Sequence, residues 1–134
     1  MNNKIKSIQK LLLKYDYSFY LVTNSDIHLN ESPNLLQKDI YNLTGFDCSN
    51  GYLLILEKKT VFFTDSRYTL AAEKFFKKKI STIDIKNQSI SDYLKSLGSN
   101  FNGLVDPKLI SINDMNILQK KLYESNIKIY PSTK

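Results

Sequence analysis

The stretch Thr60–Lys77 (Thr-Val-Phe-Phe-Thr-Asp-Ser-Arg-Tyr-Thr-Leu-Ala-Ala-Glu-Lys-Phe-Phe-Lys) decides the fold of this chain. Its opening run, Val61–Thr64, is β-branched and aromatic, which favours a strand covered on both faces. Asp65 is then expected to cap the helix that follows, because an aspartate oxygen accepts free backbone N–H groups. Arg67 and Tyr68 would lie in the first helical turn, at the carboxyl end of a strand, where open α/β sheets bind ligands. A cation is unfavourable in a first helical turn, so we expect Arg67 to have an acidic partner, inside the fold or outside it.

Composition limits the class of protein. The chain has 134 residues, of which 42% are hydrophobic and 24% charged, and this is typical of one soluble globular domain. It contains no apolar run of the ~20 residues that span a membrane, and Cys48 is its single cysteine. We therefore predict a cytoplasmic protein with no membrane partner. The net charge is +6, but Arg67 is the only arginine, whereas nucleic-acid readers use many. No nucleic-acid partner is predicted, and binding through net charge remains the weakest alternative.

Hydrophobic spacing and turn residues predict an alternating order of helices and strands. Helices are expected at 4–15, 38–43, 70–76, 89–98 and 112–124. Strands are expected at 18–23, 52–57, 60–64, 80–85, 103–106 and 126–130, with irregular chain at 27–37. Ser89 should cap one helix and Gly98 should end it, while Ile90, Tyr93, Leu94 and Leu97 form its apolar face. The strands at 52–57 and 60–64 look like a hairpin. The fold class is therefore α/β, with a mixed, mostly parallel sheet of five to six strands and helices on both faces.

The residue types alone do not make a complete active site. His28 is the single histidine, and a catalytic metal needs several converging ligands, so a hydrogen-bonded loop histidine is the simpler interpretation. Cys48 has only His28 as a base. Asp26 and Asp65 could act as an acid–base pair, but both end strands, where aspartate usually caps the chain. No catalytic residue and no metal ligand is assigned.

Four motifs nonetheless point to one family. In chain order they are Tyr-Leu-Val-Thr at 20–23, Ser-Asp-Ile-His at 25–28, Leu-Thr-Gly-Phe-Asp at 43–47 with Ser49 and Gly51, and Phe-Thr-Asp-Ser-Arg-Tyr at 63–68 with Ala71 and Glu73. Their order and spacing resemble the N-terminal domain of aminopeptidase P, prolidase and creatinase. In that family the third motif continues Gly-Ser-x-Gly, and the fourth reads Asp-Gly-Arg-Tyr. Here Cys48 and Ser66 replace glycines of these two motifs, and Ile27 replaces a small residue.

The resemblance implies a creatinase N-terminal fold with a ribonuclease H-like layout, filling residues 1–134 as a single domain. The family's catalytic pita-bread domain is expected to be absent from this chain. That second domain holds a pair of divalent metals, usually manganese, so this chain would need no cofactor of its own.

The implied function is that of the non-catalytic N-terminal domain of a cytoplasmic Xaa-Pro aminopeptidase-like metallopeptidase. It would border the active site and support substrate selection and oligomerisation. Its partners would be its own C-terminal catalytic domain and a second copy in a homodimer. Arg67, Tyr68, Asp26 and His28 match the family's marked motifs, which implies that they border the substrate site or fix the fold. For Arg67 the alternative is an internal ion pair that braces the strand–helix corner.

The chain alone is predicted to be inactive. The alternative function is a stand-alone peptide- or protein-interaction module of the same fold, with no peptidase partner domain. This alternative exists because a histone-chaperone subunit has an N-terminal domain that looks like this family and has lost its catalysis.

Overall fold

The computed structural model describes residues 3–23, 39–46, 51–105 and 112–132. Its helices are α1 (Asn3–Tyr15), α2 (Asp39–Thr44), α3 (Thr69–Phe76), α4 (Ile90–Leu97) and α5 (Ile112–Leu122), followed by the 3-10 helix η2 (Tyr123–Ser125). Its strands are β1 (Phe19–Thr23), β2 (Gly51–Leu56), β3 (Thr60–Thr64), β4 (Ser81–Asp84), β5 (Phe101–Val105) and β6 (Ile127–Pro131). Each predicted helix and strand is present with a small shift at its boundaries. The predicted irregular segment 27–37 lies outside the described residues.

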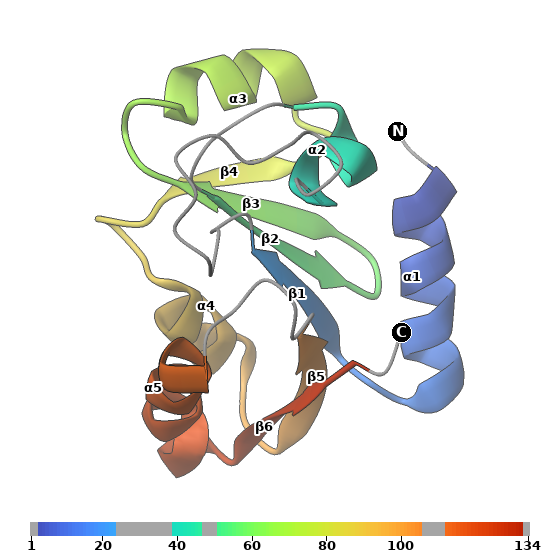
Figure 1. Ribbon diagram of the computed structural model, residues 1–134, viewed down its shortest axis with the longest axis vertical. Helices are drawn as coiled ribbons and strands as arrows, with labels where there is room; N and C mark the ends of the chain where they lie inside the picture. Colours follow the sequence, from blue (N-terminus) through green and yellow to red (C-terminus); the bar gives the residue numbers. More distant parts are fainter. Residues whose placement is uncertain (1–2, 24–38, 47–50, 106–111, 133–134) are drawn as a thin grey trace.

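The strands form one six-stranded sheet in the order β4-β3-β2-β1-β5-β6 (Figure 1). β2 runs antiparallel to both of its neighbours, and the other adjacent pairs are parallel. The hairpin of β2 and β3 pairs Gly51 with Thr64 and Ile55 with Thr60. The predicted mixed, mostly parallel sheet is therefore confirmed. A single antiparallel strand follows from the short hairpin, because parallel neighbours need a longer crossover.

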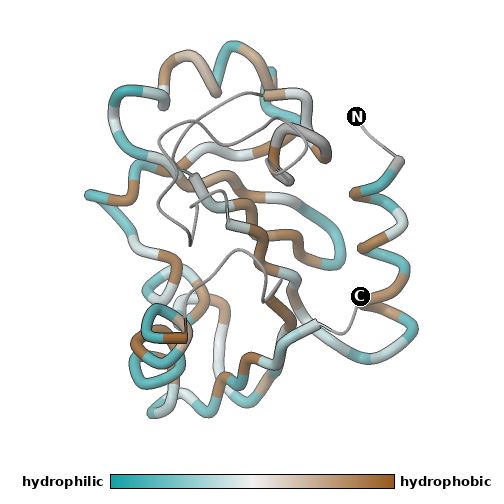
Figure 2. Tube along the Cα trace, viewed as in Figure 1, coloured by the Kyte–Doolittle hydropathy of each residue, from teal (hydrophilic) through white to brown (hydrophobic). Residues whose placement is uncertain are grey.

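Helices cover both faces of this sheet and enclose two apolar layers. Figure 2 shows that the central strands carry the most continuous apolar chain. All five residues of β3 are buried. Successive side chains of a strand point to opposite faces, so Phe62 belongs to the apolar layer under α1, α2 and α3 while Phe63 belongs to the layer under α4 and α5. Full burial of each such ring stabilises the fold by about 1.5–3 kcal/mol.

The helix α4 begins after Ser89 and ends before Gly98, as the sequence predicts. The Ser89 hydroxyl accepts the Asp92 backbone N–H at 3.2 Å and caps the helix. Gly98 ends it with φ of 136°, a conformation that side-chain-bearing residues rarely adopt. The predicted apolar face is wrong at Leu97, which is 45% exposed. It lies in the last turn of the helix, just before the capping glycine.

Gly103 provides a test of the packing between β1 and β5. It pairs with Phe19, and a Cβ atom at this position would collide with the Phe19 ring. We expect Gly103→Ala to lower the free energy of unfolding by about 1–3 kcal/mol through overpacking. Urea denaturation measures this loss. The double variant Phe19→Leu/Gly103→Ala should be less destabilised than the sum of the two single variants. Additive losses would contradict the proposed collision.

Candidate functional site

Five of the six strands run in the same direction, so their carboxyl ends lie along one edge of the sheet, here called the carboxyl edge. Open α/β sheets bind ligands at such an edge. Arg67 and Tyr68 follow β3 at this edge. Asp26 and His28 come after β1 in the chain but lie outside the described residues. Their assignment as site residues therefore stays a prediction.

The corner between β3 and α3 is a tight turn held by Asp65. The Tyr68 backbone N–H bonds to the Asp65 carbonyl at 3.0 Å, which closes the turn. The carboxylate of Asp65 accepts the Arg67 backbone N–H at 2.9 Å. It also accepts Arg67 Nε at 3.1 Å and Nη2 at 2.9 Å, so the ion pair is bidentate. This geometry orients the planar guanidinium group more firmly than a single contact could.

The helix starts later than the residue types predicted. α3 begins at Thr69, its N-cap position is Tyr68, and no side chain caps it. The predictions that Asp65 caps this helix and that Arg67 and Tyr68 occupy its first turn are therefore wrong. The physical reason is that the Asp65 carboxylate oxygens accept hydrogen bonds from Arg67 in the turn that precedes the helix. The expected acidic partner of Arg67 is confirmed, and it is Asp65.

The Arg67 side chain is exposed to solvent, but its bonds to Asp65 hold it in one orientation. It is 71% exposed, whereas the Asp65 side chain is only 19% exposed. The hydrogen bonds that Arg67 donates to Asp65 raise the pKa of Arg67 above its ordinary value, and the negative charge of Asp65 adds to the shift. The guanidinium carbon lies 5.4 Å from the centre of the Tyr68 ring. Arg67 thus presents a permanent positive charge, held against an aromatic ring, at the surface of the domain.

A second cluster lies at the carboxyl edge on the opposite face of the sheet. A pocket of about 330 Å³ has Leu21, Ile90 and Leu118 among its apolar lining, while Tyr52, Asp114 and Lys121 add polar groups. Burial raises the pKa of Tyr52, and the charge of Asp114 raises it further. No local sequence pattern marks this cluster, because Tyr52 and Asp114 are brought together only by the packing of α5 on the sheet.

The third motif of the sequence is structural in its described part. The Thr44 hydroxyl donates to the Ile40 carbonyl at 2.7 Å and accepts the Phe46 N–H at 3.1 Å. Gly45 has φ of 82°, and the predicted helix end at this glycine is confirmed. Phe46 then packs with its ring centre 5.7 Å from that of Phe62. These residues anchor α2 to the sheet, and Cys48 lies outside the described residues.

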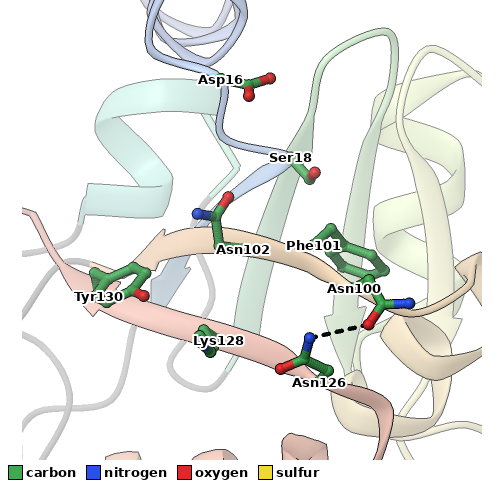
Figure 3. A pocket seen from close by; sticks show the side chains of 8 residues that line it. All are labelled: Asp16, Ser18, Asn100, Phe101, Asn102, Asn126, Lys128 and Tyr130. Carbon is green, nitrogen blue, oxygen red and sulfur yellow. Dashed lines mark hydrogen bonds between the residues drawn. The ribbon is translucent and has the colours of Figure 1, made fainter.

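A polar pocket of about 390 Å³ occupies the opposite, amino edge (Figure 3). Asn126 donates to Asn100 Oδ1 at 2.9 Å there. Asp16, Asn100 and Asn126 all have positive φ values, of 62°, 63° and 54°. Asparagine and aspartate tolerate this conformation better than most residues. These side chains therefore serve the turns before the strands, and we do not assign them a ligand.

The described part of the chain has neither a cluster of metal ligands nor a membrane-spanning helix. Within it, no group of three or more His, Cys, Asp or Glu side chains could hold a metal ion. None of its helices is long and apolar enough to cross a membrane. The described residues therefore do not fit a resident metal pair.

The chain belongs to the Creatinase/Prolidase N-terminal domain family, whose model matches residues 4–134. It is 28% identical over 123 residues to a probable Xaa-Pro aminopeptidase P from Laccaria bicolor. That match covers 89% of this chain but 19% of the relative. The chain thus spans about a fifth of the length of this curated relative, and corresponds to the N-terminal domain of such peptidases.

Solved structures share the fold. A cytosolic X-prolyl aminopeptidase from Caenorhabditis elegans, described as having a di-nuclear active site, matches with a TM-score of 0.77 and 20% identity. The match covers 88% of this chain and 20% of that enzyme. The N-terminal domain of the cytoplasmic peptidase PepQ from Mycobacterium tuberculosis matches with a TM-score of 0.68 and 17% identity, covering 98% and 94% of the two chains. The predicted family and fold are confirmed.

Substitutions at Asp65 and Arg67 should show separately how much the turn and the ion pair stabilise this corner. We expect Asp65→Ala to lower the free energy of unfolding by about 1 kcal/mol, because a hydrogen bond contributes about 0.5–1.5 kcal/mol and the turn N–H loses its acceptor. Arg67→Ala should leave the unfolding midpoint nearly unchanged, since exposed ion pairs contribute little. Urea denaturation compares the two variants. Equal losses would mean that the guanidinium group, rather than the turn, stabilises this corner.

The raised pKa of Tyr52 predicts that the free energy of unfolding falls at alkaline pH. Its folded-state pKa is raised above 10.0, so the unfolded chain loses this proton first as the pH rises. The stability that Tyr52 contributes is present below that value and is lost as the pH rises through the folded pKa. We expect Tyr52→Phe to remove this component of the decline and Asp114→Asn to reduce it, as measured by urea unfolding across an alkaline pH series. Identical slopes in wild type and Tyr52→Phe would contradict the assignment.

Proposed function

We propose that this chain is the N-terminal, non-catalytic domain of a cytoplasmic Xaa-Pro aminopeptidase-like metallopeptidase. It fills residues 1–134 as one domain, and a C-terminal domain of the same polypeptide carries the catalytic metal pair. The observation that carries this proposal is the family match over residues 4–134, set against a relative about five times as long.

The metal pair belongs to the proposed C-terminal domain, with manganese as the metal. The support is that the Caenorhabditis elegans enzyme is described as cytosolic and di-nuclear. The described residues of this chain supply no cluster of ligands for such a pair. The role of the chain is therefore to shape and border the site, without a chemical step of its own.

Arg67 and Tyr68 are proposed to border the substrate site from the carboxyl edge. Two of the Arg67 nitrogens bond to Asp65, and the group is 71% exposed, so its outward side can donate to a peptide carbonyl or carboxylate. Asp26 and His28 are proposed for the same border from their motif alone. Substrate selection and homodimer formation through this domain belong to the same proposal.

The purified chain of 134 residues should not hydrolyse an Xaa-Pro peptide, with or without added manganese, because its described residues hold no group of metal ligands. Release of the N-terminal residue from a proline-containing peptide is the measurement. A metal-dependent rate that remains after repurification would sink the proposal.

The role of Arg67 is tested in the longer protein. Arg67→Ala should lower kcat/KM for an Xaa-Pro peptide roughly tenfold, mainly through KM, because the lost group binds the substrate and the transition state equally. Lys95→Ala, which removes an exposed cation from α4, is the matched control. Unchanged kcat/KM in Arg67→Ala would remove Arg67 from the site while leaving the domain assignment intact.

The gene itself discriminates the domain assignment from the alternative of a stand-alone interaction module. A reading frame that continues into a pita-bread domain with all of its metal ligands supports the peptidase. A following domain that lacks those ligands supports the module.

A further inference from the structure

The two edge strands of the sheet are protected differently against pairing with another chain. On β6, Ser132 donates its backbone N–H to the Val105 carbonyl, so strand alternation turns Pro131 outward, where it has no N–H to donate. Lys128 adds a charge to the same strand. Proline and lysine are residues that block edge pairing. β4, with the sequence Ser81–Asp84, contains neither.

The outer edge of β4 presents three backbone groups, the N–H and C=O of Thr82 and the N–H of Asp84, whereas the Asp84 carbonyl already accepts the Asn87 N–H at 2.9 Å and the Gln88 N–H at 3.2 Å. Ile85 donates its N–H to the Thr64 carbonyl at 3.0 Å, so alternation turns the backbone groups of Thr82 and Asp84 away from β3. Among the described residues, no strand pairs with this edge. The Thr82 hydroxyl oxygen is also buried without a hydrogen-bond partner in that part of the chain. Such atoms are uncommon in folded proteins, so their position is informative.

A groove of about 660 Å³ lies at this edge and is lined by residues of α3, β4 and the start of α4. Its lining includes three carboxylates, from Glu73, Asp84 and Asp92, and no lysine or arginine. Lys79 and Lys86 come just before and just after β4 in the chain, but neither lines the groove. On a protein with net charge +6, this groove is locally acidic.

The strand alternation decides how a bound chain would meet these charges. Ile83 packs against the apolar layer under α4 and α5. Thr82 and Asp84 therefore point to the other face, toward α3. A strand added to β4 would turn alternate side chains toward Glu73 and Asp84 on the α3 side. The side chains between them would face Asp92 and the amide of Gln88 on the α4 side.

We propose that the outer edge of β4 binds an extended peptide segment by strand addition, and that this segment carries basic side chains at alternate positions. Main-chain hydrogen bonds to the N–H and C=O of Thr82 and to the N–H of Asp84 would supply affinity, and the carboxylates would select the charge. A second copy of this chain is disfavoured, because a two-fold contact would bring the same acidic grooves together. This inference does not depend on the catalytic domain.

The test uses the isolated chain, since a separately solved domain of this fold, from PepQ, covers nearly the same length. A short peptide of alternating lysine and threonine is titrated into labelled protein and followed by backbone amide NMR. We expect shifts centred on Thr82, Asp84 and their neighbours, and binding that weakens with added salt. The double variant Glu73→Gln/Asp92→Asn should weaken binding roughly tenfold. The matched control, Glu57→Gln/Glu124→Gln, removes two exposed carboxylates elsewhere and should bind like wild type.

Three outcomes would overturn the proposal. The first is equal binding of a peptide in which glutamate replaces lysine. The second is shifts centred away from β4. The third is concentration-dependent dimerisation in sedimentation that is abolished by the double variant, which would make a second copy the occupant.

Discussion

The structure depends on the burial of the three central strands between two helical layers. In β3, adjacent phenylalanines serve opposite faces, with Phe62 under α1, α2 and α3 and Phe63 under α4 and α5. A slip of one residue in the pairing of β3 would exchange these faces. The register of the hairpin and the positions of both helical layers are therefore fixed together. The strand directions follow, and with them the edge at which the chain presents its candidate site.

That edge explains how a domain without a described metal cluster can still contribute to a site. The corner after β3 is short and closed by backbone and side-chain bonds to Asp65, so Arg67 is exposed without being loosely held. The opposite face of the same edge carries Tyr52 beside Asp114. A neighbouring catalytic domain placed against this edge would meet a permanent cation and a partly buried phenol.

The sequence predicted much of the fold because local signals agreed with the packing. Ser89 and Gly98 bounded α4, Gly45 ended α2, and the aromatic and β-branched run before Asp65 marked β3. Two local predictions, at Asp65 and Leu97, were wrong because the surrounding structure places these side chains differently. Asp65 is a good helix cap, but in this chain its oxygens bond to Arg67 in the preceding turn. Leu97 has the right spacing for the core but lies in the last turn of its helix, where it is partly exposed.

The sequence by itself determined the order of helices and strands, the family, and the acidic partner that Arg67 required. These depend on periodicity, turn chemistry and charge within short stretches of chain. Only the tertiary structure decided which faces the strands bury, that Tyr52 lies near the charge of Asp114, and that no strand among the described residues pairs with the carboxylate-lined outer edge of β4. The physical reason is that such neighbours come from segments far apart in the chain. Their contacts depend on the register of the sheet, and no local pattern encodes that register.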